Sequence, residues 1–153
     1  MLFRSVPLIA WHPGKIKAGS TNAHISAFWD MMPTFAELTG TKPANNTDGI
    51  SFLPTLFGKS GQQQHEYLYW EFHEQGGKIA VTKGDWKAIW HDLIRPEKMS
   101  VELYHLATDI HEDHNLADRY PEMISEFGKI AKQSHTDSEA FPFLLPEDLL
   151  IQQ

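Results

Sequence analysis

The sequence predicts an α+β fold, in which a small antiparallel sheet of about four strands packs with two amphipathic helices. Two observations support this class. Between residues 66 and 106, apolar and aromatic residues alternate with polar ones in short runs that end at turn residues, as strands do. In residues 30–39 and 121–134, apolar residues recur instead at the spacing of a helix. A chain of 153 residues is long enough to enclose a core.

The N-terminal part is expected to hold one strand and one long helix. The run VPLIAW, residues 6–11, is apolar throughout and stops at HPG, which is typical of a strand buried on both faces. The helix over residues 30–39 has Asp30 placed to cap its start and Gly40 placed to end it in a left-handed conformation. Residues 51–58, SFLPTLFG, predict one or two further helical turns before a polar connector.

The sheet is predicted from segments that follow this connector. The run YLYWEFHE, residues 67–74, alternates in character at period two, so its two faces are used differently. Gly76 and Gly77 then predict a bend or bulge between strands. The sequence KGD at residues 83–85 lies between two β-rich segments and predicts a tight hairpin, which makes the pairing antiparallel. VELYHL, residues 101–106, is the fourth strand candidate.

The second amphipathic helix is predicted over residues 121–134. Pro121 suits its first turn, where a backbone N–H has no partner within the helix, and apolar residues follow at helical spacing. The tail after residue 135 is apolar but contains Pro142 and Pro146, so we expect it to lie as an extended arm over a neighbouring surface.

Composition excludes several classes of site and partner. The formal net charge is -7 and no cluster of Lys or Arg occurs, so the electrostatic footprint of a nucleic-acid-binding protein is missing. The absence of cysteine removes disulfides, thiolate nucleophiles and zinc–thiolate sites. No apolar run approaches the roughly 20 residues of a membrane-spanning helix, so no membrane span is expected. Composition leaves the cellular compartment open.

The strongest candidate for a site is the end of the aromatic strand. Glu71 and His73 share one face of that strand, whereas Glu74 points to the other, so a carboxylate and an imidazole come within reach of each other. We predict that Trp70, Glu71 and His73 bind substrate. The alternative for His73 is structural, in which the ring only satisfies a buried backbone carbonyl.

Two other patterns have both a functional and a structural interpretation. Trp70, Trp86 and Trp90 could stack on sugar rings, but strand tryptophans usually pack a sheet against a helix, and we expect at least two of the three in the core. HEDH, residues 111–114, suggests a metal cluster. Its spacing differs from the His-Glu-x-x-His of zinc proteases, and its turn-rich surroundings favour a solvated turn.

Five stretches of the sequence, taken in order, resemble successive blocks in the C-terminal third of one enzyme family, the type I sulfatases or arylsulfatases. The resemblance runs from about Val6 to about Phe143. Its most specific features are Asp-x-x-Pro-Thr before one helix and Glu-Leu-Tyr-x-Leu-x-x-Asp-x-x-Glu-x-x-Asn-Leu-Ala before another. The five blocks are VPLIAWHPGKIKAGS, FWDMMPTFAELTG, DGISFLPTLFGK, YLYWEFHEQGGKIAVTKGDWKAI and ELYHLATDIHEDHNLADRYPEM.

The resemblance implies hydrolysis of a sulfate ester, with a sulfated small molecule or glycan as substrate. The family's nucleophile is a formylglycine made from the first residue of a Cys/Ser-x-Pro-Ser-Arg motif, and it works beside a calcium ion held by carboxylates. Neither that motif nor the paired aspartates that hold the cation occur in this sequence. We therefore expect no cofactor in this chain, no activity of the chain alone, and a role as substrate-pocket wall and stabilising part of a longer hydrolase.

On this resemblance, residues 1–58 are the end of the catalytic α/β domain and residues 59–153 are a C-terminal subdomain. The strand at 6–11 belongs to the sheet of the catalytic domain, so we expect self-association through it where its partners are missing. Bacterial members of the family are often exported. Two alternatives remain open: a free-standing glycan-binding module that uses the aromatic residues of the sheet, and an independent hydrolase built on His73 and its carboxylates.

Overall fold

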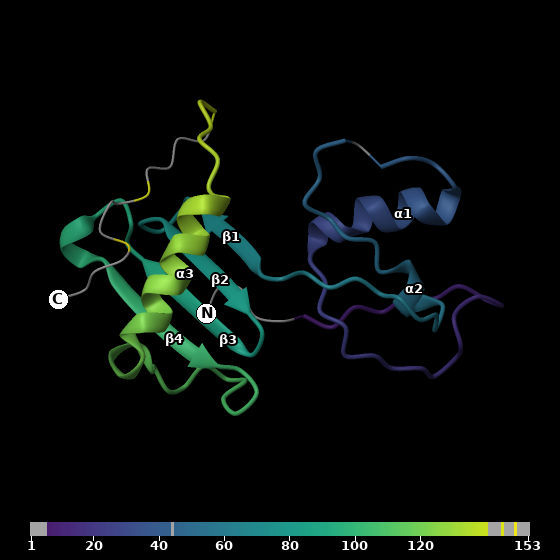
Figure 1. The fold of residues 1–153 in the computed structure, drawn as a ribbon, viewed down its shortest axis with the longest axis horizontal. Coiled ribbons are helices and arrows are strands. Elements are labelled where there is room, and N and C mark those ends of the chain that lie inside the picture. Colours follow the sequence, from purple (N-terminus) through teal and green to yellow (C-terminus); the bar gives the residue numbers. More distant parts are fainter. Residues whose placement is uncertain (1–5, 44, 141–144, 146–148, 150–153) are drawn as a thin grey trace. The chain divides into compact units, whose positions relative to one another are not determined.

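The computed structural model describes residues 6–43, 45–140, 145 and 149, which fall into two compact units (Figure 1). One unit comprises the described residues of Arg4–His65, and the other those of Glu66–Gln153. In the part of the chain that the structure describes, no helix combines the length and the apolar character needed to cross a lipid bilayer.

The unit from Glu66 onward is built on a four-stranded antiparallel sheet whose strands lie side by side in sequence order. Helix α3, Pro121–Ser134, crosses one face of this sheet (Figure 1). The predicted α+β fold is therefore confirmed. The strands are β1 (Leu68–Phe72), β2 (Lys78–Lys83), β3 (Trp86–His91) and β4 (Ser100–His105).

The predicted hairpin joins β2 to β3. Lys83 pairs with Trp86 across a two-residue turn, in which Gly84 has a φ of 57° that a residue with a side chain rarely adopts. Short 3₁₀ turns lie on either side of β4, at η2 (Pro96–Lys98) and η3 (Ala117–Arg119).

The predicted bend at Gly76 and Gly77 separates β1 from β2. The carbonyl oxygens of these glycines accept the backbone amides of Ile94 and Leu93 at 3.0 and 3.1 Å, so the bend is fixed to the segment after β3. Gly76 has a φ of 90°, which residues with a side chain rarely adopt. This backbone conformation accounts for glycine at this position of the bend.

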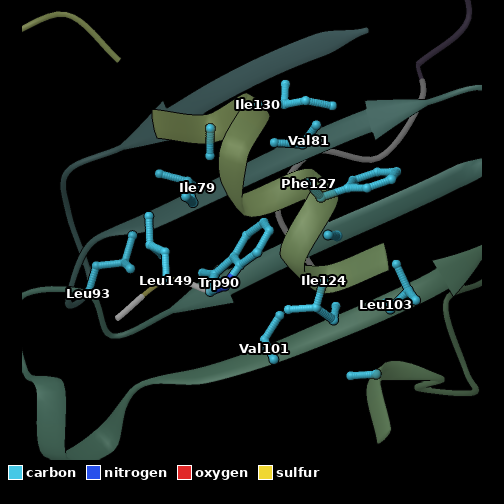
Figure 2. Close-up of a cluster of buried hydrophobic side chains, with 13 residues drawn as sticks. Ile79, Val81, Trp90, Leu93, Val101, Leu103, Ile124, Phe127, Ile130 and Leu149 are labelled. Atoms are coloured by element: carbon cyan, nitrogen blue, oxygen red, sulfur yellow. The ribbon is translucent and has the colours of Figure 1, made fainter. Parts of the chain in front are cut away.

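The face of the sheet beneath α3 forms the core of this unit. Strand alternation points every second side chain of β2, β3 and β4 toward the helix, and Figure 2 shows these side chains meeting those of α3. Trp90 on β3 and Phe127 on α3 are each 1% exposed. The predicted arm at the C-terminus lies mostly outside the described residues. The buried cluster comprises Ile79, Val81, Ala88, Trp90, Leu93, Val101, Leu103, Ala117, Ile124, Phe127, Ile130, Ala131 and Leu149.

The unit of residues 6–65 has less regular structure. The predicted long helix is α1, Met31–Thr39, preceded by the 3₁₀ turn η1, Phe28–Asp30, and it ends at Gly40 with the expected left-handed φ of 72°. The predicted short helix is α2, Leu53–Leu56.

Two details of this unit differ from the sequence predictions. The carboxylate of Asp30 makes no capping hydrogen bond to α1; it accepts the backbone amides of Ala27 and Ile50 and the ring of His65, at 2.7, 2.8 and 2.8 Å. The predicted strand at residues 6–11 is not formed, because a strand exists only where a neighbour shares its hydrogen bonds. Its apolar side chains are exposed, as Ile9 at 91% illustrates.

Candidate functional site

Four side chains converge where strand β1 meets the end of helix α3. We name Tyr69, Glu71, His73 and His135 the Glu71 cluster. Tyr69 and Glu71 project from the same face of β1 because they are two residues apart, and His73 follows directly after the strand. His135 is the residue that ends α3, where its backbone amide bonds to the carbonyl oxygen of Ala131.

Glu71 is the centre of this cluster. Its Oε1 accepts a hydrogen bond from the Tyr69 hydroxyl at 2.5 Å and lies 2.6 Å from Nδ1 of His135. Its Oε2 lies 3.1 Å from Nε2 of His73. The other nitrogen of His135, Nε2, lies 3.2 Å from Oδ1 of Asp137. The sequence prediction that Glu71 and His73 come together is thus realised, and His135 and Tyr69 are added to them.

The electrostatics of the cluster favour an ionised carboxylate. Burial acts to raise the pKa of Glu71, but hydrogen bonds from His135, Tyr69 and His73 outweigh it and hold this pKa below its usual value. Burial acts to lower the pKa of His135, and its contacts with Glu71 and Asp137 raise it overall. Burial, and then the hydrogen bond to Glu71, raise the pKa of Tyr69 well above that of a free phenol.

This arrangement is suited to holding groups in place. A general base needs a lone pair aimed at the proton it removes, and both oxygens of Glu71 already accept hydrogen bonds. The phenol of Tyr69 stays protonated at neutral pH and is turned toward Glu71. His73, whose side chain is 35% exposed, is the member that solvent reaches most readily, compared with 20% for Glu71 and 12% for His135.

The structure separates the third predicted site residue from the other two. Trp70 lies between Tyr69 and Glu71 in the sequence, so its side chain points to the opposite face of the sheet. There it packs against a small cluster with Ala80 and Ile89. Of the three tryptophans considered for the core, Trp90 is fully buried and the other two are half-buried against apolar clusters.

The segment HEDH, residues 111–114, forms a turn. Both carboxylate oxygens of Asp109 accept backbone amides from it, those of Asp113 and His114, at 3.0 and 2.9 Å. Oε1 of Glu112 lies 2.6 Å from Nζ of Lys87 on β3. Across the described residues, no three His, Asp or Glu side chains are grouped so that they could hold a metal ion.

A polar hollow of about 610 Å³ is lined by residues of the unit of residues 6–65. Burial lowers the pKa of His24 on its wall, which keeps that ring neutral at physiological pH. The lining offers hydrogen-bonding groups without a paired acid and base, so we assign it no chemistry. The lining residues are Asn22, Ala23, His24, Thr55, Gly58, Lys59, Gln62 and Gln64.

Comparison with known families gives a match over most of the chain. The family described as N-sulphoglucosamine sulphohydrolase, C-terminal, matches residues 3–136. The sheet, helix α3 and the Glu71 cluster all lie within these residues.

Individual relatives are sulfatases of much greater length. An ulvan-active sulfatase of Formosa agariphila is 42% identical over 64 residues, which are 42% of this chain and 13% of that protein. An N-acetylgalactosamine-6-sulfatase of Mus musculus is 33% identical over 87 residues, 55% of this chain and 16% of its own length. A solved structure in complex with D-glucosamine-2-N,6-O-disulfate has the same fold, with a TM-score of 0.65 and 23% identity, over 80% of this chain and 26% of the other.

Proposed function

This chain belongs to the N-sulphoglucosamine sulphohydrolase C-terminal family, and we propose that it is the C-terminal portion of a sulfuric ester hydrolase, in which it supplies part of the substrate-pocket wall and stabilises the enzyme. The relatives named above are sulfatases several times longer than the stretch they share with this chain. These relatives do not favour a free-standing glycan-binding module.

The observation that carries the pocket-wall role is the Glu71 cluster. It holds the ring of His73 at the end of an edge strand through a carboxylate that Tyr69 and His135 also contact. Because Nε2 of His73 faces Glu71, a hydrogen bond to substrate would involve Nδ1. The protonated ring would donate Nδ1–H to an oxygen of an anionic sulfate, and the neutral ring would accept from a sugar hydroxyl.

The substrate class follows from the names of the relatives. They are described as acting on ulvan and on an N-acetylgalactosamine 6-sulfate group. We propose that the complete enzyme takes a sulfated glycan, whose hydroxyl and sulfate groups suit a wall of imidazole and carboxylate groups. Trp70, on the other face of the sheet, would take part only through a second surface.

The chemistry is assigned to residues outside this chain. A formylglycine and a calcium ion supply the nucleophile and its activation in the family, and we propose that both belong to the catalytic portion of the enzyme. The chain alone is then inactive. Turnover of an aryl sulfate by the purified chain, above a boiled control and abolished by a chelator, would contradict this assignment.

The role of His73 is tested in a full-length sulfatase that carries residues 66–140 of this chain in place of its own. A hydrogen bond to a charged group contributes roughly 1.5–3 kcal/mol, so His73→Ala should lower kcat/KM on a sulfated glycan about 10- to 100-fold without a change in melting temperature. A variant that is less stable but kinetically normal would refute the pocket assignment and leave His73 a structural role.

We also propose that the isolated chain self-associates through residues 6–11. Val6, Ile9 and Trp11 are 73%, 91% and 84% exposed, and contiguous apolar surface of this kind drives association in water.

A further inference from the structure

We propose that His135 is a positioning residue, which fixes the Glu71 carboxylate so that the carboxylate in turn fixes the ring of His73. This inference rests on the proposed function, since it extends the substrate contact assigned to His73. It adds a residue that lies 64 positions beyond Glu71 in the sequence and belongs to a different element of the fold.

His135 is held through both its backbone and its side chain. Its backbone amide donates to the carbonyl oxygen of Ala131 at 3.0 Å, so the residue is anchored to the last turn of α3. Its side chain is 12% exposed and has a carboxylate oxygen at each ring nitrogen, from Glu71 at 2.6 Å and from Asp137 at 3.2 Å. A ring with two such partners has little freedom to turn.

The number of protons on the His135 ring decides how many carboxylates it can bind as a donor. A neutral imidazole carries one N–H and can donate to one carboxylate, whereas the imidazolium carries two and can donate to both. The charged groups in contact with this ring include Glu71 and Asp137, and Tyr69 and His73 in turn contact Glu71. The raised pKa of His135 agrees with a ring that is stabilised as the imidazolium by two carboxylates.

Without the His135 ring, Glu71 loses one of the contacts that orient its carboxylate. The terminal torsion of a glutamate is broad, so the carboxylate plane is set by its hydrogen bonds. Tyr69 and His135 together fix Oε1, which leaves Oε2 directed at Nε2 of His73. With Tyr69 alone on Oε1 the carboxylate would rotate about that bond, and His73 would lose its fixed partner.

The test is the tautomer of His73, read by nitrogen-15 NMR of the histidine rings in the intact chain. In the native chain we expect His73 to be held with its proton on Nε2. In His135→Ala, the His73 signals should become the average of the two neutral tautomers. His135→Asn places an amide N–H near the position of Nδ1 of His135 and should restore the fixed tautomer of His73. His135→Gln places its amide near the position of Nε2 of His135 and should not restore it.

The controls separate positioning from general damage. His114→Ala removes a histidine that is 81% exposed in the HEDH turn and should leave the His73 signals unchanged. If His135→Ala does not fold, Asp137→Asn serves instead. The Asp137 side chain is 92% exposed, so this change should not disturb folding. The loss of the Asp137 charge should lower the titration midpoint of His135. An unchanged His73 tautomer in a folded His135→Ala chain, or an unchanged His135 midpoint in Asp137→Asn, would overturn the proposal.

A kinetic comparison in the full-length sulfatase described above distinguishes the two proposals. His135→Ala should lower kcat/KM by about tenfold, and His135→Asn should recover most of that loss. A changed His73 tautomer with unchanged kinetics supports the positioning role and refutes His73 as a substrate contact. An unchanged tautomer refutes the positioning role whatever the kinetics.

Discussion

Residues 66–140 and residues 6–65 differ in the fate of their large apolar side chains. In the first region the sheet and α3 bury residues such as Ile79 and Phe127 almost completely, and among its described residues only Ile94 and Ile110 are large, apolar and exposed. In the second region the buried apolar residues are few. Its exposed large apolar residues are Val6, Leu8, Ile9, Trp11, Ile25, Phe28, Met32, Phe35 and Leu38.

The region of residues 6–65 is held together largely by buried polar groups. Thr34 donates to the carbonyl oxygen of Asp30 at 2.6 Å and accepts the amide of Phe52 at 3.0 Å, while the Asp30 carboxylate accepts the amide of Ile50. Hydrogen bonds of this kind fix geometry but contribute only about 1 kcal/mol each in net stability. The sheet unit therefore completes its own core, whereas the described residues of the other region leave many large apolar side chains exposed.

The largest effect that we expect from this difference is on the self-association of the isolated chain. The intact chain should elute from size exclusion as a broad, concentration-dependent species, and a chain lacking residues 1–13 should be more monodisperse. Phe28→Ser combined with Phe35→Ser should act in the same direction, because both side chains lie on the exposed side of η1 and α1.

Ile110→Ser is the matched control, since Ile110 is 60% exposed but belongs to the sheet unit. It should leave the elution profile unchanged. A sharp monomeric peak from the intact chain at every concentration would contradict the comparison.

A pair of identical substitutions in the two regions gives the next largest effect. Phe127→Ala removes a side chain that is 1% exposed and should lower the free energy of unfolding by about 3–5 kcal/mol. Phe28→Ala removes one that is 83% exposed and should change it by less than about 0.5 kcal/mol. Urea denaturation followed by circular dichroism measures both, and equal effects would show that Phe28 is buried in solution.

Much of the sheet unit could be predicted because its signals are local. Period-two alternation predicted β1, the glycine in residues 83–85 predicted the hairpin, and helical spacing predicted α3. The same alternation placed Glu71 and His73 on one face of a strand. These inferences require only neighbouring residues.

The rest depends on contacts between distant parts of the chain. His135 follows a helix in a polar stretch, and no local pattern indicates that this helix ends beside strand β1. Asp30 has the position of a helix cap, but its carboxylate is taken by Ile50 and His65, which lie 20 and 35 residues further on. The run at residues 6–11 has the composition of a strand, and composition cannot supply the partner strand.

Two lysines of one hairpin test how burial changes the value of an ion pair. The side chain of Lys87 is 2% exposed, and its Nζ lies 2.6 Å from Oε1 of Glu112. The side chain of Lys83 is 36% exposed, and its Nζ lies 2.8 Å from Oε1 of Glu126. Lys87→Met leaves a largely buried carboxylate without its cation and should lower the free energy of unfolding by about 3 kcal/mol. Lys83→Met should lower the free energy of unfolding much less, because solvent screens an exposed ion pair. Similar losses in urea denaturation would contradict the burial argument.

The smallest effect concerns the pH dependence of the contact between Glu71 and His135. The pKa of His135 is raised from 6.5, so its contribution to stability is complete below about pH 6.5 and is lost as the pH rises through the raised value. The pKa of Glu71 is lowered from 4.5, so its contribution is complete above about pH 4.5 and is lost as the pH falls through the lowered value. Between these limits both groups are charged, and the contact is strongest.

His135→Asn isolates this charge, because asparagine keeps a donor for Glu71 and cannot be protonated. The native chain should be more stable than this variant by on the order of 1 kcal/mol at pH 5.5, and the difference should shrink toward zero at pH 8.5. Urea denaturation at the two pH values provides the measurement. A difference that stays constant or grows with pH would mean that His135 is not held as an imidazolium, and that its contact with Glu71 depends on the shape of the ring instead of its charge.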